Sequence, residues 1–91
     1  MEIIKSLGEI LANKINISPT AARGLIKLAI KDEVGAFTLV NKVNFNEIQK
    51  TIQNSLKKRF INLTIQDVDI IIESLLTQLN EIQSLITMAN V

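Results

Sequence analysis

The feature that most constrains this chain is the spacing of apolar residues near its C-terminal end. From residue 65 to residue 89 these residues recur in steps of three and four without a break, at Ile65, Val68, Ile72, Leu75, Leu79, Ile82, Ile86 and Ala89. Alternating steps of this size place side chains along one side of an α-helix, as in heptad repeats. The spacing therefore predicts a helix over about 65–88 whose apolar side must be covered by protein. Thr64 and Asp67, which have the spacing of a capping box, mark its expected start.

Two helices are predicted in the first third of the chain. Apolar residues at helical spacing predict one over about 2–15. A second, over about 18–32, is predicted to begin at Ser18-Pro19. A serine hydroxyl can accept a hydrogen bond from a free N–H at a helix start, and proline fits the first turn because its missing N–H needs no partner there.

A third helix is predicted over about 45–60, where Asn44 and Glu47 have capping-box spacing. Residues 34–43 link it to the preceding helix and contain β-branched and aromatic residues, so we expect an irregular or β-hairpin-like segment. The fold class predicted for residues 1–91 is all-α: one small four-helix domain.

Catalytic chemistry is poorly represented in the composition. The chain has no His and no Cys, so the commonest general base and the strongest nucleophile are both missing. Ser55 and Lys58 have Ser-x-x-Lys spacing but lack the further motifs of acyl-enzymes. Asp67, Asp69 and Glu73 are near one another in sequence, but acids are expected in the first turns of any helix. We predict no enzyme activity, no metal and no cofactor.

Charge is unevenly distributed along the chain. All 10 Lys and Arg lie in residues 1–59 with five acids, a net charge of +5, whereas residues 60–91 carry four acids and no base, a net charge of −4. The N-terminal sequence does not resemble a signal peptide, and no apolar run is long enough for a membrane span. We therefore expect a cytoplasmic protein without a membrane partner.

The last predicted helix has a wide apolar side, which Ile71, Leu76, Leu85 and Met88 broaden. Either it is the central helix of the domain's own bundle, or part of it contacts a second copy (a homodimer) or another protein. The function that we expect is a non-catalytic interaction, adaptor or oligomerisation module. The predicted partner interface consists of Leu75, Leu79, Ile82, Leu85, Ile86 and Ala89.

A DNA-binding function is the alternative. About 22 residues within "ILANKINISPTAARGLIKLAIKDE" resemble helix-turn-helix motifs: Ala12 permits close helix crossing, and Asn16 lies where the motif most often has glycine. The resemblance implies that residues 18–32 are the recognition helix, that the following link is a wing and that the last helix is a dimer stem. The nucleic-acid contacts would then be Thr20, Arg23, Lys27 and Lys31.

Overall fold

The computed structural model describes residues 2–37, 39 and 42–89 of the chain. The elements are α1 (Glu2–Ile15), α2 (Pro19–Val34), α3 (Phe45–Thr51), the π-helical segment η2 (Ile52–Leu56), α4 (Lys57–Asn62) and α5 (Val68–Ala89). Because α3, η2 and α4 follow one another without a gap, they form one continuous rod, called helix 45–62 below. The predicted all-α fold with four helices is confirmed.

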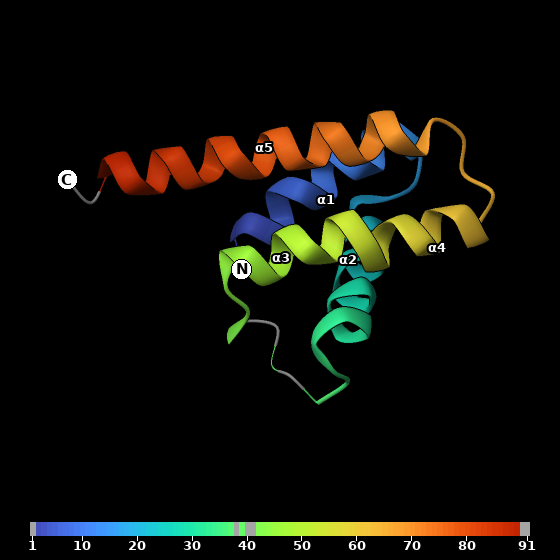
Figure 1. Cartoon of the computed structure of the whole chain (residues 1–91). Coiled ribbons are helices and arrows are strands. Elements are labelled where there is room, and N and C mark those ends of the chain that lie inside the picture. Colours follow the sequence, from blue (N-terminus) through green and yellow to red (C-terminus); the bar gives the residue numbers. More distant parts are fainter. Residues whose placement is uncertain (1, 38, 40–41, 90–91) are drawn as a thin grey trace.

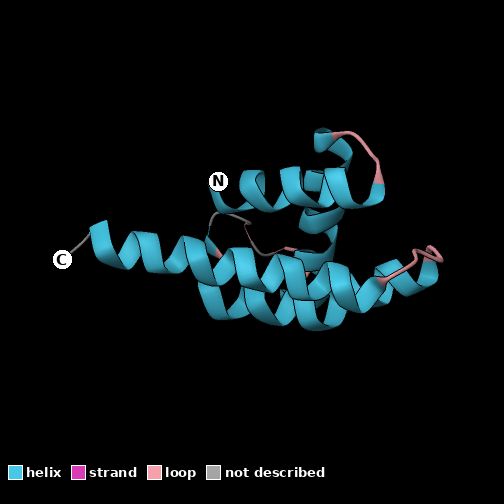
Figure 2. Ribbon diagram, turned by 90° about the horizontal axis from the view of Figure 1, so that it is seen from above, coloured by secondary structure: helices cyan, strands magenta, loops and turns pink. Residues whose placement is uncertain are grey.

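The helices are arranged so that α5 lies along one side of the molecule and α2 lies away from it (Figures 1 and 2). Between them, α1 and helix 45–62 both contact α5 and both contact α2. α5 has 22 residues and α1 has 14, which makes them about 33 Å and 21 Å long. In both views the C-terminal part of α5 extends past the ends of the other helices.

The core consists of aliphatic residues from every helix with one phenylalanine. Its fully buried members include Leu7, Ile26, Leu56, Phe60 and Leu75. Ile52 and Ile72 are also buried, whereas Leu25 of α2 is only partly buried and packs against the edge of the core. Thr51, the buried polar residue, donates its hydroxyl to the Glu47 carbonyl oxygen at 2.7 Å, so its burial leaves no unpaired donor.

The π-helical segment has a physical reason in the sequence. The buried row Ile48, Ile52, Leu56 and Phe60 has a constant step of four residues. In a regular α-helix each such step overshoots a full turn by about 40°, so the row would rotate away from the core. A π turn, with its wider i→i+5 bonding, reduces this rotation. The segment therefore keeps all four side chains on the core side.

The start of α5 differs from the prediction. The helix begins at Val68, because Thr64 has a left-handed backbone (φ 58°) and ends the preceding helix. The N–H of Thr64 donates to the Ile61 carbonyl at 3.0 Å, and that of Ile65 to the Phe60 carbonyl at 3.0 Å. This is the Schellman pattern of a helix C-terminus. The capping box predicted at Thr64 is wrong, since an N-cap residue needs an extended backbone.

The link between α2 and α3 is described only in part. α2 continues two residues further than expected, to Val34, and Gly35 ends it with φ 112°. The Lys42 N–H donates to the Leu39 carbonyl at 3.0 Å. The described residues of this link contain no strand, and residues 38, 40 and 41, on which the hairpin prediction also falls, lie outside the described part.

Candidate interaction surfaces

The first half of α5, residues 68–79, is the part that the bundle covers, and we call it the packed half. Ile71 and Ile72 are buried at 4% and 8% exposure, and Leu75 and Leu79 are at 0%. Leu75 and Leu79 were expected to contact a partner. Their side chains are instead enclosed by the chain's own helices, so they belong to the core and are not accessible to a second protein.

The second half of α5 is different. Residues 82–89, which we call the overhang, remain helical up to Ala89 and project beyond α1 and helix 45–62 (Figures 1 and 2). Ile82, the first residue of the overhang, is partly exposed, and Gln83 and Ser84 are exposed. The side chains of Leu85, Ile86 and Ala89, the other predicted contacts, lie outside the described part of the structure. Of the predicted interface, the overhang thus retains Ile82 and these three positions.

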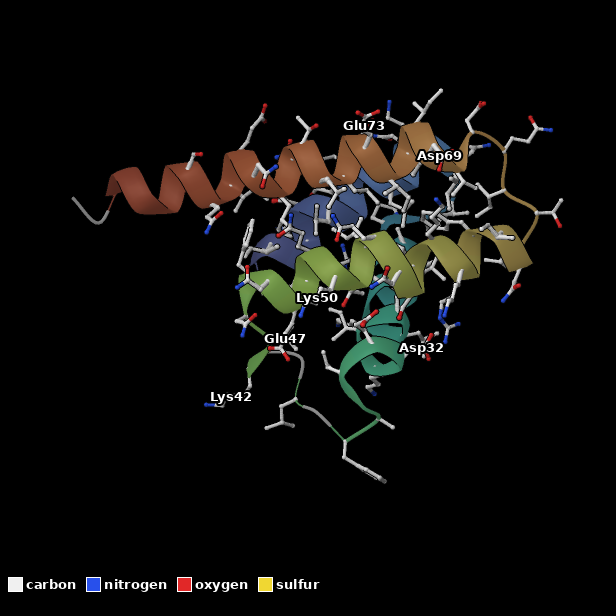
Figure 3. The ribbon with its side chains drawn as sticks, in the orientation of Figure 1. Asp32, Lys42, Glu47, Lys50, Asp69 and Glu73 are labelled. Carbon is white, nitrogen blue, oxygen red and sulfur yellow. The ribbon has the colours of Figure 1, made fainter. Side chains whose placement is uncertain are left out.

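Acidic residues line the outer side of α5. Figure 3 shows Asp69 and Glu73 on this helix, with Lys50 on α3 below it and Lys42 further down, in the link. Asp69 pairs with Lys57 Nζ at 3.1 Å. Glu73 and Glu81 are exposed and have no ion-pair partner among the described residues, and they line a groove of about 490 Å³ together with Ile10 and Lys14 of α1. No group of three carboxylates close enough to hold a metal ion occurs among the residues described.

Two of the three cations of α4 pair with acids of neighbouring helices. Arg59 Nε donates to Asp32 Oδ2 of α2 at 2.6 Å, and Lys57 pairs with α5 as above. Ser55 Oγ, one member of the Ser-x-x-Lys pair, donates to Glu33 Oε1 at 2.9 Å. These side chains tie helix 45–62 to both its neighbours, and surface pairs of this kind contribute about 0–1 kcal/mol each. Lys58 is exposed.

The turn between α1 and α2 is short and closed by hydrogen bonds. Asn16 has a left-handed backbone (φ 58°), and the Ile17 N–H donates to the Ala12 carbonyl at 3.1 Å, which is the long bond of a Schellman motif. Ser18 then caps α2 by accepting from the Ala21 N–H at 3.1 Å. The turn is therefore short and specified by hydrogen bonds at both ends.

The α1–α2 crossing is close because Gly8 has no side chain. A Cβ added there would lie 2.6 Å from Arg23 Cγ, so Arg23 packs over α1. Its guanidinium Nη2 donates to Thr20 Oγ1 at 3.2 Å. Thr20, Lys27 and Lys31 are exposed, whereas Arg23 is only partly exposed. Of the four predicted nucleic-acid contacts, Thr20, Lys27 and Lys31 are therefore exposed, although Thr20 is bonded to Arg23, and Arg23 itself is engaged in the helix crossing.

Sequence reasoning missed several exposed apolar side chains. Ile70 of the packed half is 60% exposed, beside the α1–α5 groove, and Phe37 in the link is 99% exposed. For Ile70 the signal was present, since it stands outside the three-and-four spacing of α5. For Phe37 no pattern distinguishes an exposed aromatic residue from a buried one in so short a segment.

Together these features place the chain in a broad structural class, the small all-α domains with a projecting C-terminal helix, and in no particular family. Comparison of the chain with protein-family models, with curated proteins and with solved structures finds no match in any of the three. No helix in the described residues combines the length and the apolar character needed to cross a lipid bilayer.

Proposed function

We propose that this chain is a non-catalytic protein–protein interaction or oligomerisation module that uses the overhang of α5 as its contact surface. One observation carries the proposal. α5 extends past the helices that cover it, and the apolar spacing of its sequence continues in this uncovered part, at Ile82, Ile86 and Ala89. The same spacing in the packed half marks the side that the bundle buries.

The small number of apolar side chains in the overhang favours a modest affinity. Burial of one large aliphatic side chain contributes about 1.5–3 kcal/mol. A short overhang offers only a few such residues, and association costs at least about 4 kcal/mol in lost rigid-body freedom. We therefore expect an interaction whose extent depends on protein concentration in the micromolar range or above, and not a permanent assembly.

Substitution in the overhang tests this proposal. Ile82→Glu and, one turn further, Ile86→Glu place a charge on the apolar side of the helix, and each should lower the average mass of the protein at concentrations where the wild type associates. Sedimentation equilibrium over a range of concentrations measures this mass, and circular dichroism verifies that the helical content is retained.

Gln83→Glu is the matched control, because it adds the same charge to the same turn at an exposed position. Its mass should equal that of the wild type. If the wild type stays a monomer at all concentrations, self-association is excluded and only a contact with another protein remains. If Gln83→Glu dissociates the complex as well as Ile82→Glu does, the apolar side of the overhang is not the contact.

DNA binding is the second candidate, and the hydrogen-bonded turn between α1 and α2 favours it. Helix-turn-helix proteins place the second helix in the major groove and use its exposed side for contacts. In α2 that side carries Thr20, Lys27 and Lys31. Arg23 is held over Gly8 and bonded to Thr20, so its contact would require this arrangement to open. Lys27 and Lys31 therefore become the residues on which this candidate depends.

A duplex-binding measurement separates the two functions. If α2 binds DNA, the wild type should bind at low salt, with an affinity that falls steeply as salt rises. Lys27→Ala/Lys31→Ala should then weaken binding much more than Lys50→Ala/Lys58→Ala, which removes the same charge from exposed sites on helix 45–62. Fluorescence anisotropy measures both. Equal effects of the two double variants, or no binding at low salt, would exclude α2 as a DNA-reading helix.

A further inference from the structure

The α1–α5 groove lies on a side of α5 that the core does not bury. α1 contributes Ile10 and Lys14 to its described lining, and α5 contributes residues between Ile70 and Glu81. Ile70 is 60% exposed, although it is a large apolar side chain. The groove is therefore an accessible surface between two helices, separate from the apolar side of the overhang.

A second hollow, of about 500 Å³, extends the groove along α5. It is lined by Thr77, Asn80, Glu81 and Ser84, and it shares Thr77 and Glu81 with the first. From residue 70 to residue 84 the two hollows follow about 21 Å of helix. A surface of this kind suits a second helix, which lies along the groove and is fixed by a few side chains at helical spacing.

The charge of the groove is negative. Glu73 and Glu81 are exposed, have no ion-pair partner among the described residues and are eight residues apart, about 12 Å along the helix. Lys14 is the one cation in the described lining. Ile70 precedes Glu73 by three residues. The α5 side of the groove thus presents an apolar side chain and two carboxylates in a fixed order.

The outer side of helix 45–62 carries the complementary side chains. Lys50 and Lys58 are exposed, are eight residues apart and have no ion-pair partner in the described part of the chain. They follow the buried Ile48 and Leu56 by two residues each, a rotation of about 200°, so both lie away from the core. Ile61, three residues after Lys58, is 58% exposed. The order and intervals on this helix are those of the groove in reverse.

We infer that helix 45–62 of one copy docks in the α1–α5 groove of a second copy and runs antiparallel to its α5. Each lysine then faces a glutamate, Lys58 with Glu73 and Lys50 with Glu81, and the two exposed isoleucines face each other. Complementary charge at matching intervals favours a second copy as the occupant. The inference does not depend on the overhang, and it adds a second contact surface to the proposed function.

The isoleucines determine the direction. A parallel helix would also pair the charges, because the two intervals of eight residues are equal, but it would place Ile70 opposite Glu47 and Ile61 opposite Ser84. α1 and α5 run in opposite directions (Figures 1 and 2), so Lys14, near the end of α1, lies at the Ile70 end of the groove. In the antiparallel arrangement this cation meets the C-terminal end of the docked helix, where the helix dipole is negative.

The contact joins two different surfaces, so it is heterologous. A copy that docks its helix 45–62 still offers its own groove to a third copy, and association continues unless a ring closes. Exposed ion pairs are screened by salt, since the Debye length falls from about 10 Å at 0.1 M to about 3 Å at 1 M. The average mass should therefore rise past that of a dimer at high concentration and low salt, and fall as salt is added.

Exchange of the charges tests the contact. An Ile82→Glu background removes the overhang contact of the proposed function, and sedimentation equilibrium at low salt then measures the association that remains. Lys50→Glu/Lys58→Glu and Glu73→Lys/Glu81→Lys should each lower the association constant about tenfold or more, because two attractions become repulsions. All four changes in one chain reverse both surfaces, leave the net charge unchanged and should restore association.

Lys27→Glu/Lys31→Glu is the matched control, because it makes the same change of charge at exposed positions of α2. By itself it should leave association unchanged. Combined with Glu73→Lys/Glu81→Lys it again keeps the net charge, but it should not restore association, since the groove and the outer side of helix 45–62 are then both basic. Circular dichroism verifies the helical content of every variant.

Cross-linking tests the direction. The chain has no cysteine, so an oxidised mixture of Ile61→Cys and Ile70→Cys should form a mixed disulfide, identified by mass spectrometry, more readily than a mixture of Ile61→Cys and Ser84→Cys. The opposite preference would overturn the antiparallel arrangement.

Three results would overturn the contact itself. One is an Ile82→Glu protein that is monomeric at every concentration, and the proposed function would still stand if the wild type associates. Another is failure of the fourfold charge exchange to restore association. The third is equal restoration by the control combination, because net charge and not a direct contact would then govern association.

Discussion

The packed half and the overhang of α5 have the same apolar spacing and different surroundings. In the packed half, Leu75 and Leu79 are fully buried by the chain's own helices. In the overhang, the helix continues to Ala89 and extends past the other helices that the structure describes (Figure 1). The comparison shows that a periodic pattern determines which side of a helix is apolar, whereas the lengths of the neighbouring helices determine how much of that side they cover.

The difference between the two halves is tested most directly by replacing one isoleucine in each half with alanine. Ile72 is 8% exposed and Ile82 only partly buried. Ile72→Ala should lower the free energy of unfolding by about 2–5 kcal/mol, the range for a large-to-small change in a core. Ile82→Ala should lower it by less than about 1 kcal/mol at dilute protein concentration, because little of the fold depends on the overhang. Urea denaturation with a helical signal measures both.

The same two variants also test how the stability of the protein depends on its concentration. A partner that binds only the folded state raises its apparent stability by mass action. The wild type should therefore become harder to unfold as its concentration rises, and Ile82→Ala should reduce that increase. Similar losses for both variants at dilute concentration would show that the overhang belongs to the domain's core, and the distinction between the halves would be lost.

Much of the fold could be predicted from local chemistry. Ser18 and Asn44 cap their helices as expected, with the Glu47 N–H donating to Asn44 Oδ1 at 2.8 Å. Capping depends on residues within one turn, so the sequence contains the whole interaction. The same local reasoning failed at Thr64, because Thr-x-x-Asp is also compatible with a helix end, and only the position of Ile65 against the core distinguishes the two.

The candidate interface was less predictable, for a physical reason. Leu75 and Ile82, seven residues apart, occupy equivalent positions in the sequence pattern, but one is fully buried and the other is not. The difference arises from where α1 and helix 45–62 end in space, which no property of α5 encodes. Likewise, Arg23 has the spacing of an exposed cation, and its packing over Gly8 depends on how α1 and α2 cross.

The smallest effect that we predict concerns the turn that leads into the packed half. Threonine is β-branched and strongly disfavoured at positive φ, yet Thr64 has φ 58°. Thr64→Gly should relieve left-handed strain of about 1–2 kcal/mol, offset by about 0.5–1 kcal/mol from the greater freedom of glycine in the unfolded chain. The expected net gain in the free energy of unfolding is about 0.5–1 kcal/mol, measured by urea denaturation.

Asn16→Gly is the matched control for this change, because Asn16 occupies the equivalent position at the end of α1 with the same φ of 58°. Asparagine tolerates the left-handed region far better than threonine, so its replacement should change stability by only a few tenths of a kcal/mol. Since Thr64 lies in the turn before the packed half, at the opposite end of α5 from the overhang, Thr64→Gly should leave the concentration dependence of association unchanged. A loss of stability, or a gain no larger than that of Asn16→Gly, would mean that Thr64 is not strained in the folded chain.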